Sequence, residues 1–252
     1  MLYPNIHFAH FIDRPNRFIA HCRLVETGEV VTTHVKNTGR TTILQPGVTT
    51  ALVYTNSPKR KTQYDLVAAK KYDRYWINID SLAPNVLVHE GLSTNYIQLP
   101  GIKRITKVIP EVKFLESRLD FMGFDEQNRP FFVEVKGVTL GNQQVGAFPD
   151  APTTRGLKHV QTLEHALDQG YRSYLLFIVQ MPHIHLVTIN QAIDAALATE
   201  VKRAQALGVR VMAHGTKVTP DTITLTTPLP FVAAFPFESD GLPSSITPKS
   251  KQ

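Results

Sequence analysis

The sequence has 252 residues, of which 42% are hydrophobic and 19% are charged, and this composition excludes a largely disordered chain. Its length suits one large domain or two small ones. The formal net charge of +6 favours a polyanionic partner but does not bear on the fold.

Short β-strands separated by turn residues are predicted for the first part of the chain, residues 1–82. Apolar and polar residues alternate in most of them, and glycine and proline stand between them. The predicted strands are 17–25, 30–36, 46–56, 63–72 and 74–80. Five short strands favour a small barrel or sandwich, and an OB-like barrel is one candidate.

From residue 83 the pattern alternates between helices and strands, which predicts a mixed sheet covered by helices over residues 83–235. Either Thr153 or Thr154 can cap the second helix, and Gly170 ends it. The predicted helices are 83–97, 150–170 and 191–208, and the later strands are 171–181, 183–189, 209–218 and 222–229. Residues 236–252, rich in proline, serine and lysine, are expected to form a tail.

The segment 117–138 carries acids in an apolar setting and is predicted to be a β-hairpin. If Phe124 pairs with Pro130, Asp120 lies opposite Glu134 and Arg118 opposite Lys136. Alternation along a strand then places Asp120, Glu134 and Lys136 on one face. A register shifted by one residue would move the two acids to opposite faces.

Two carboxylates on one face need a nearby positive charge, because at about 4 Å they repel by roughly 4 kcal/mol at an effective dielectric constant near 20. Mg²⁺ or Mn²⁺ would supply it, with Lys136 orienting a water or stabilising charge on a phosphate. Cross-strand ion pairs on a solvated sheet face are the alternative. The residues alone leave both interpretations open.

Asp120, the hairpin and Glu134-x-Lys136 resemble the core of PD-(D/E)xK nuclease-like domains. Up to about Phe231, the sequence is also similar to the sugar fermentation stimulation protein family, with blocks in that family's order. These blocks are "NTGR" (37–40), "PG" (46–47), "SPKRKTQYDL" (57–66), "PEVKF" (110–114), "SRLDF" (117–121), "VEVKGVTL" (133–140) and "FPDAPTTRGLKH" (148–159).

The resemblance implies an OB-like N-terminal domain, a nuclease-like second domain and DNA binding. It makes Asp120 and Glu134 the core acids and metal ligands, and Lys136 the core lysine. Glu111, in "PEVKF", resembles the additional acid that often precedes this core, and is expected to be a further metal ligand.

The sequence departs from the family pattern in two places. Arg40 and Thr41 stand where small or apolar residues are usual, and Gly137 stands where serine is commoner. Neither change removes an expected ligand.

Nucleic-acid contacts are expected from basic residues near this core and from the basic segment 57–61, although that segment also fits a solvated loop. The first turns of the helix after Asp150 can hold a phosphate with backbone N–H groups and basic side chains. Alternatively, Asp150 is only a turn residue and Arg155 pairs with a core acid. The expected contact residues are Arg155, Lys158, His159, Arg118, Lys59, Arg60 and Lys61.

Together these patterns predict a DNA-binding protein with a Mg²⁺- or Mn²⁺-dependent nuclease-like site that hydrolyses phosphodiester bonds. A non-catalytic DNA-binding regulator of sugar catabolism is the alternative. The single cysteine, Cys22, excludes an internal disulfide framework and favours a reducing compartment. With no apolar run long enough to span a bilayer, we expect a cytoplasmic protein that does not contact membranes. Strandedness, sequence specificity and oligomeric state stay open.

Overall fold

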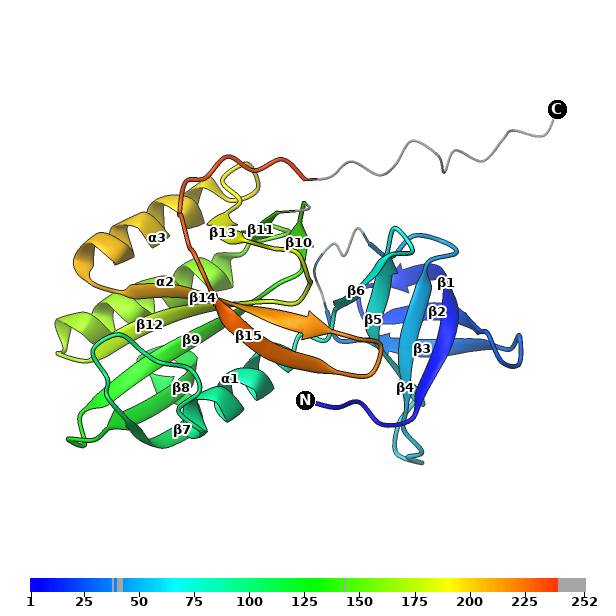
Figure 1. Cartoon of the computed structure of the whole chain (residues 1–252), viewed down its shortest axis with the longest axis horizontal. Helices are drawn as coiled ribbons and strands as arrows, with labels where there is room; N and C mark the ends of the chain where they lie inside the picture. Colours follow the sequence, from blue (N-terminus) through cyan, green and yellow to red (C-terminus); the bar gives the residue numbers. More distant parts are fainter. Residues whose placement is uncertain (38, 40–42, 143, 240–252) are drawn as a thin grey trace.

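The computed structural model of the chain describes residues 1–37, 39, 43–142 and 144–239. Figure 1 shows a β-barrel on one side and a helix-covered sheet on the other. Most of the predicted tail, from residue 240 onward, lies outside the described residues, as do Arg40 and Thr41.

The N-terminal part is a closed barrel of five strands with one further strand at its side. β1 pairs antiparallel with β2 and β4, β2 with β3, and β4 with β5, and a parallel pairing of β3 with β5 closes the barrel. This topology is that of an OB-like barrel. The strands are β1 (Ile6–Asn16), β2 (Ile19–Leu24), β3 (Val30–Val35), β4 (Thr49–Tyr54), β5 (Tyr64–Lys71) and β6 (Tyr75–Asn78).

The predicted barrel is confirmed, but its strands were assigned differently. The five predicted strands correspond to β2 to β6, whereas the barrel uses β1 as a member and β6 only extends β5. Strand β1 was missed because irregular pairing near Asp13 interrupts the alternation that buries Ala9 and Phe11, and Pro15 follows.

The second part is a six-stranded mixed sheet in the order β15-β14-β12-β9-β8-β7. The central strands β9, β12 and β14 are parallel, and the outer ones pair antiparallel. Strand β7 was not predicted. The strands are β7 (Ile105–Phe114), β8 (Ser117–Asp125), β9 (Pro130–Val138), β12 (Arg172–Val179), β14 (Arg210–Val218) and β15 (Ile223–Leu229).

Helices cover both faces of this sheet (Figure 1). α1 (Ala83–Ser93) packs in a cluster with Val133 and Leu176, whereas α2 (Thr154–Asp168) and α3 (Ala195–Leu207) pack in the cluster that contains Phe132 and Phe177. Successive residues of β9 and β12 thus face opposite helical layers, as strand geometry requires. A small sheet holds β10 (Leu140–Gly141), β11 (Val145–Phe148) and β13 (Leu186–Ile189). The predicted class, an OB-like barrel followed by a mixed α/β sheet, is confirmed.

All three helices are shorter than predicted. Of the two candidate caps of α2, Thr153 is the one used, because its hydroxyl accepts a hydrogen bond from the Gly156 amide at 2.9 Å. None of the helices in the described part of the chain is long and apolar enough to cross a membrane.

Direct contacts join the two parts. The side chain of Gln180, just after β12, donates from Nε2 to the Asn78 side chain at 2.8 Å and to the Asp80 carbonyl at 3.0 Å. The Asn78 amide donates in turn to the Gln180 carbonyl. At the other side, Leu2, next to the N-terminal Met1, forms a β-bridge with Thr222, beside the start of β15. The ends of β9 and β12 therefore lie against the barrel.

Candidate active site at the open end of the β8–β9 hairpin

The predicted register of the hairpin is confirmed: Phe124 pairs with Pro130, and the pairing continues to Phe121 and Val133. The backbone ladder ends there, so the expected backbone pairing of Asp120 with Glu134 is not formed. Instead, the Asp120 carboxylate accepts a hydrogen bond from the amide of Val135 at 2.7 Å. The Asp120 side chain thus bridges β8 and β9 where their backbones separate, and the two acids remain neighbours.

Glu134 is buried, with 1% of its surface exposed. Its Oε1 atom accepts a hydrogen bond from Lys136 Nζ at 2.5 Å and also contacts His159 Nδ1. Burial alone would raise the pKa of Glu134, but Lys136 and His159 hold it below the usual value of a glutamate. Glu134 is therefore ionised, with two basic groups on one oxygen.

Asp120 has a different environment, although it lies beside Glu134. Its Oδ1 atom accepts a hydrogen bond from Asn85 Nδ2, on α1, at 2.8 Å. Burial and the negative charge of Glu134 raise the pKa of Asp120 to about 6, against the opposing effects of the Val135 amide, Lys136 and Asn85. Asp120 and Glu134, called the acid pair below, thus carry more negative charge than their surroundings balance.

His159 and Arg155 extend this network along α2. His159 is buried, and its Nε2 atom lies 3.4 Å from Arg155 Nε. Because the guanidinium can only donate, Nε2 is the acceptor and Nδ1 carries the proton directed at Glu134. His159, which we expected to contact nucleic acid, therefore lies against Glu134. Arg155 is exposed and contacts His159, not a core acid.

The additional acid, Glu111, lies apart from this network. It is exposed on β7, and Arg118 lies 3.6 Å from it. No three or more histidine, cysteine, aspartate or glutamate side chains within the described residues are arranged to hold a metal ion. The expected three-acid set of Asp120, Glu134 and Glu111 is therefore not assembled in this structure.

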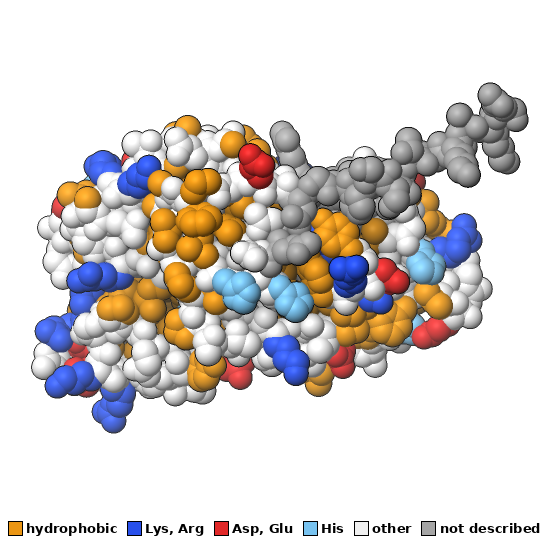
Figure 2. All heavy atoms as spheres, turned by 45° about the horizontal axis from the view of Figure 1, so that its top comes forward, with side chains coloured by type: hydrophobic (Ala, Val, Ile, Leu, Met, Phe, Trp, Pro, Cys, Tyr) orange, Lys and Arg blue, Asp and Glu red, His pale blue; other side chains and the backbone are white. Residues whose placement is uncertain are grey.

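The remaining basic residues are exposed except Arg60, which is half-buried, and several contact groups of the protein. Lys158 donates to the carbonyl of Glu116 at 3.2 Å, and Arg60 donates to Asp65 at 3.2 Å. Lys59 and Lys61 are exposed in the β4–β5 loop. On the face drawn in Figure 2, Lys and Arg side chains gather at the left end, while over the barrel they are mixed with acidic and histidine side chains.

Sequence reasoning did not find Asn85. It lies near the start of α1, about 35 positions before Asp120, and its contact depends on how α1 packs across the sheet. A polar residue in the first turn of a helix is common, so no local pattern distinguishes Asn85 from a solvated surface residue.

Comparison with known proteins agrees with both halves of the fold. The model described as "SfsA N-terminal OB domain" matches residues 12–79, and the one described as "Sugar fermentation stimulation protein RE domain" matches residues 82–222. The chain belongs to the sugar fermentation stimulation protein family. Relatives described as sugar fermentation stimulation protein homologs are 46% identical over 244 residues in Enterococcus mundtii and 45% identical over 245 residues in Lacticaseibacillus casei. These alignments cover 96% and 97% of this chain and all of each relative.

A solved structure of a family member has the same fold. SfsA from Pyrococcus furiosus, in complex with Ca²⁺, superposes with a TM-score of 0.81 at 24% sequence identity. The superposition covers 92% of this chain and 98% of that protein. At this level of identity the likeness supports the fold of the family, barrel and mixed sheet together.

Proposed function

We propose that this chain binds DNA and hydrolyses phosphodiester bonds with Mg²⁺ or Mn²⁺ held at the acid pair. The observation that carries the proposal is the pair itself, because Asp120 and Glu134 meet next to Lys136 with a raised pKa on Asp120. Strained electrostatics of this kind are typical of functional sites. The Ca²⁺ bound by the Pyrococcus furiosus relative adds support, since Ca²⁺ and Mg²⁺ both prefer oxygen ligands.

The residues present fit a divalent cation. Lys136 already places a positive charge on Glu134 Oε1, while Oε2 has only a long contact, 3.4 Å, with the Asp120 amide. Burial and the negative charge of Glu134 raise the pKa of Asp120, and a bound cation would oppose both effects. When bound, the metal would polarise the phosphate and lower the pKa of a water. Asp120 and Glu134 would hold it.

The other groups of the site have roles that follow from their contacts. Lys136 is placed to stabilise charge on a phosphate or to orient water, because its ammonium lies at the partly buried edge of the acid pair. His159 holds the same oxygen of Glu134 that Lys136 contacts, and the exposed Arg155 extends the network to the surface. Glu111 joins the site as a further ligand only if it leaves Arg118.

DNA would be held along its backbone by exposed basic residues. Arg155, Lys158 and Arg118 lie on the sheet part, and Lys59 and Lys61 lie in the loop between β4 and β5. That loop is one that OB-like barrels use to bind oligonucleotides. We place this activity in the cytoplasm. We also assign residues 1–82 to the OB-like domain and residues 83–235 to the nuclease-like domain.

A DNA-binding regulator of sugar catabolism without turnover is the second candidate. One observation favours it: every carboxylate of the acid pair already has donors from the protein, and Glu111 stands apart. Such a site can be stable without a metal. The two candidates predict the same binding and differ only in cleavage.

Metal-dependent cleavage of labelled single- and double-stranded DNA and RNA separates them. We would compare the wild type with Glu134→Gln and Lys136→Ala, and with Glu116→Gln, an exposed acid at the β7–β8 turn, as control. Binding is recorded in parallel at two salt concentrations. Cleavage in Mg²⁺ or Mn²⁺ that is lost in the first two variants and kept in the control supports the nuclease. Salt-sensitive binding without cleavage in either metal supports the regulator.

A further inference from the structure

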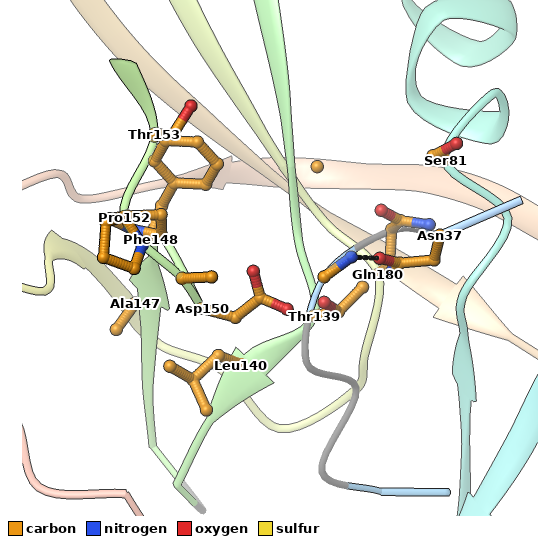
Figure 3. Close-up of a pocket in the computed structure, with 14 residues that line it drawn as sticks. Asn37, Ser81, Thr139, Leu140, Ala147, Phe148, Asp150, Pro152, Thr153 and Gln180 are labelled. Carbon is orange, nitrogen blue, oxygen red and sulfur yellow. Dashed lines mark hydrogen bonds between the residues drawn. The ribbon is translucent and has the colours of Figure 1, made fainter. Parts of the chain in front are cut away.

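A cavity of about 320 Å³ lies between the barrel and the sheet, and Gly137, the residue after Lys136, is part of its lining. It is lined from the barrel side by Asn37, Gly39 and Ser81, and from the sheet side by residues after β9 and β12 and by the segment that leads into α2. Figure 3 shows these side chains around a common space. The carboxyl ends of parallel strands are the usual place for ligands in open α/β sheets. The volume suits one small organic group.

The floor of the cavity carries a hydrogen-bond acceptor of fixed orientation. Gln180 is 2% exposed, and its Nε2 atom is engaged by Asn78 and by the Asp80 carbonyl. These bonds assign the amide, so Oε1 is directed to the other side, over Gly137. A Cβ atom on Gly137 would lie 2.3 Å from that oxygen. Glycine at this position thus leaves room for the Gln180 carbonyl oxygen at the cavity floor.

A carboxylate forms the second acceptor. Figure 3 shows the Asp150 side chain directed into the cavity, toward Thr139. One of its oxygens lies against Gly39, where an added Cβ would be 2.2 Å away. Within the part of the chain that the structure describes, no hydrogen bond reaches this carboxylate, and the guanidinium of Arg14 interacts with it electrostatically. Arg14 supports the cavity wall by donating to the carbonyls of Asn37 at 2.5 Å and of Gly39 at 3.2 Å.

Apolar residues form only part of the other walls, next to the polar residues Ser81, Thr139 and Thr153. Leu140, Ala147, Phe148, Pro149 and Pro152 line the cavity on the sheet side. Apolar surface beside fixed acceptors suits a flat ring that carries N–H donors along one edge. A nucleobase out of its stack has this chemistry, and enzymes read such a base through its Watson–Crick edge between apolar side chains.

We propose that this cavity binds one unstacked base of the bound nucleic acid and prefers guanine. Guanine presents two adjacent donors, N1–H and the 2-amino group, which match the two oxygens of the Asp150 carboxylate. Thymine offers a single donor between two carbonyls, and its carbonyls would face the acceptors. The proposal rests on the proposed function, because it takes a nucleic acid as the ligand.

Residues that line the cavity are neighbours in the chain of residues in the proposed active site. Gly137 directly follows Lys136 in β9, and Thr153 caps α2 two residues before Arg155. A base seated over Gly137 would therefore place its own backbone near Lys136 and the acid pair. The cavity then determines which nucleotide lies next to the reacting phosphate.

The test measures binding without metal, so that no cleavage occurs. Oligothymidine and the same oligonucleotide with one central guanine are titrated against the full chain in EDTA at low salt. We expect the guanine to tighten binding about tenfold in the wild type. Asp150→Asn removes this advantage and leaves oligothymidine binding unchanged, which also shows that the variant is folded. Asp73→Asn, the same charge change at an exposed turn of the barrel, keeps the advantage.

A second readout locates the base. A fluorescent guanine analogue with an intact Watson–Crick edge should brighten on binding to the wild type, because unstacking relieves its quenching, and should stay quenched with Asp150→Asn. Equal binding of the two oligonucleotides, or an advantage that survives Asp150→Asn, overturns the cavity proposal and leaves the nuclease proposal intact. If neither oligonucleotide binds at low salt, the proposed function itself fails.

Discussion

Strand β8 carries two aspartates in opposite electrostatic situations. Asp125, at the turn of the hairpin, is fully buried, and its carboxylate accepts hydrogen bonds from Arg129 Nε at 2.8 Å and from Arg172 at 2.7 Å. Two backbone amides, of Gln127 and Arg129, also donate to it. Asp120, at the open end, has Glu134 as its strongest charged neighbour.

These surroundings shift the two pKa values in opposite directions. Burial would raise the pKa of Asp125, but its amide and arginine donors lower it well below the usual range of an aspartate. Burial and Glu134 raise the pKa of Asp120 to about 6. The donors around Asp125 thus more than offset the cost of burying its charge. The donors around Asp120 do not, and Lys136 supplies only part of the positive charge that would stabilise its ionised carboxylate.

The largest effect on stability is expected from Asp125→Asn. The amide cannot balance Arg129 and Arg172 and turns an N–H toward one of them, so the hairpin turn loses its anchor. Because the folded-state pKa is depressed, the contribution of Asp125 is fully present above the unfolded value of about 4 and is lost as pH falls through the folded value. Urea unfolding from pH 3 to 8 should therefore show a large, constant loss above about pH 5 that shrinks in acid.

Glu116→Gln is the matched control for this measurement, since Glu116 is an exposed acid at the other turn of β8. Its unfolding midpoint should stay close to that of the wild type across the pH range. An Asp125→Asn protein as stable as the control at neutral pH would contradict the assignment of Asp125 as a structural anchor.

The same substitution at Asp120 is expected to raise the free energy of unfolding instead of lowering it. A raised folded-state pKa means that ionising Asp120 costs stability, starting above the unfolded value of about 4 and complete above about 6. Asp120→Asn removes this cost, and the Asn85 amide can turn to accept from the new N–H. Without metal, the variant should be about 3 kcal/mol more stable than the wild type at pH 8 and nearly equal to it at pH 4.

Addition of Mg²⁺ or Mn²⁺ should reverse that order, because ligand binding stabilises only the protein that retains both acids. Urea unfolding at pH 8 with and without metal provides the check. A destabilised Asp120→Asn protein in metal-free buffer at pH 8 would show that the acid pair is a structural feature like Asp125.

Asn85→Ala tests whether α1 positions the site. Loss of the hydrogen bond to Asp120 Oδ1 frees this carboxylate to rotate, and removal of such a supporting partner typically weakens metal affinity about ten- to a hundredfold. Calorimetric titration with Mn²⁺ measures the change. Val86→Ala, at the next and exposed position of α1, should leave affinity unaltered. Equal affinities for the two variants would remove Asn85 from the site.

The sequence predicted the hairpin and the barrel because both depend on local patterns. Apolar alternation and a polar turn determine which residue of β8 faces which of β9, and short punctuated strands indicate a barrel. Strands β1 and β7 were missed for a physical reason. Bulges interrupt β1, and β7 is a mostly exposed edge strand that contains Pro110, so neither shows sustained alternation.

The site was predictable only in part for a similar reason. Asp120 and Glu134 stand out because acids interrupt an apolar hairpin. The contacts of Asn85 and His159 with them arise from the packing of α1 and α2 on opposite faces of the sheet, at sequence separations that no periodicity records. Glu111 shows the reverse, since its place in the chain suggested a ligand and its exposed side chain lies near Arg118 instead.

The smallest effect on stability is expected from replacing two exposed lysines, Lys59 and Lys61. Lys59 and Lys61 are exposed, and neither takes part in an ion pair within the described residues, whereas Arg60 between them is committed to Asp65. Replacing both lysines by alanine should leave the unfolding midpoint unchanged and weaken DNA binding, with the salt dependence of log K reduced by about 2 if each lysine contacts one phosphate. Arg60→Ala should instead lower stability, because the buried Asp65 loses one of its basic partners and keeps only Lys36 and His34. A double variant with unaltered salt dependence would place the DNA on the sheet part alone, next to the acid pair.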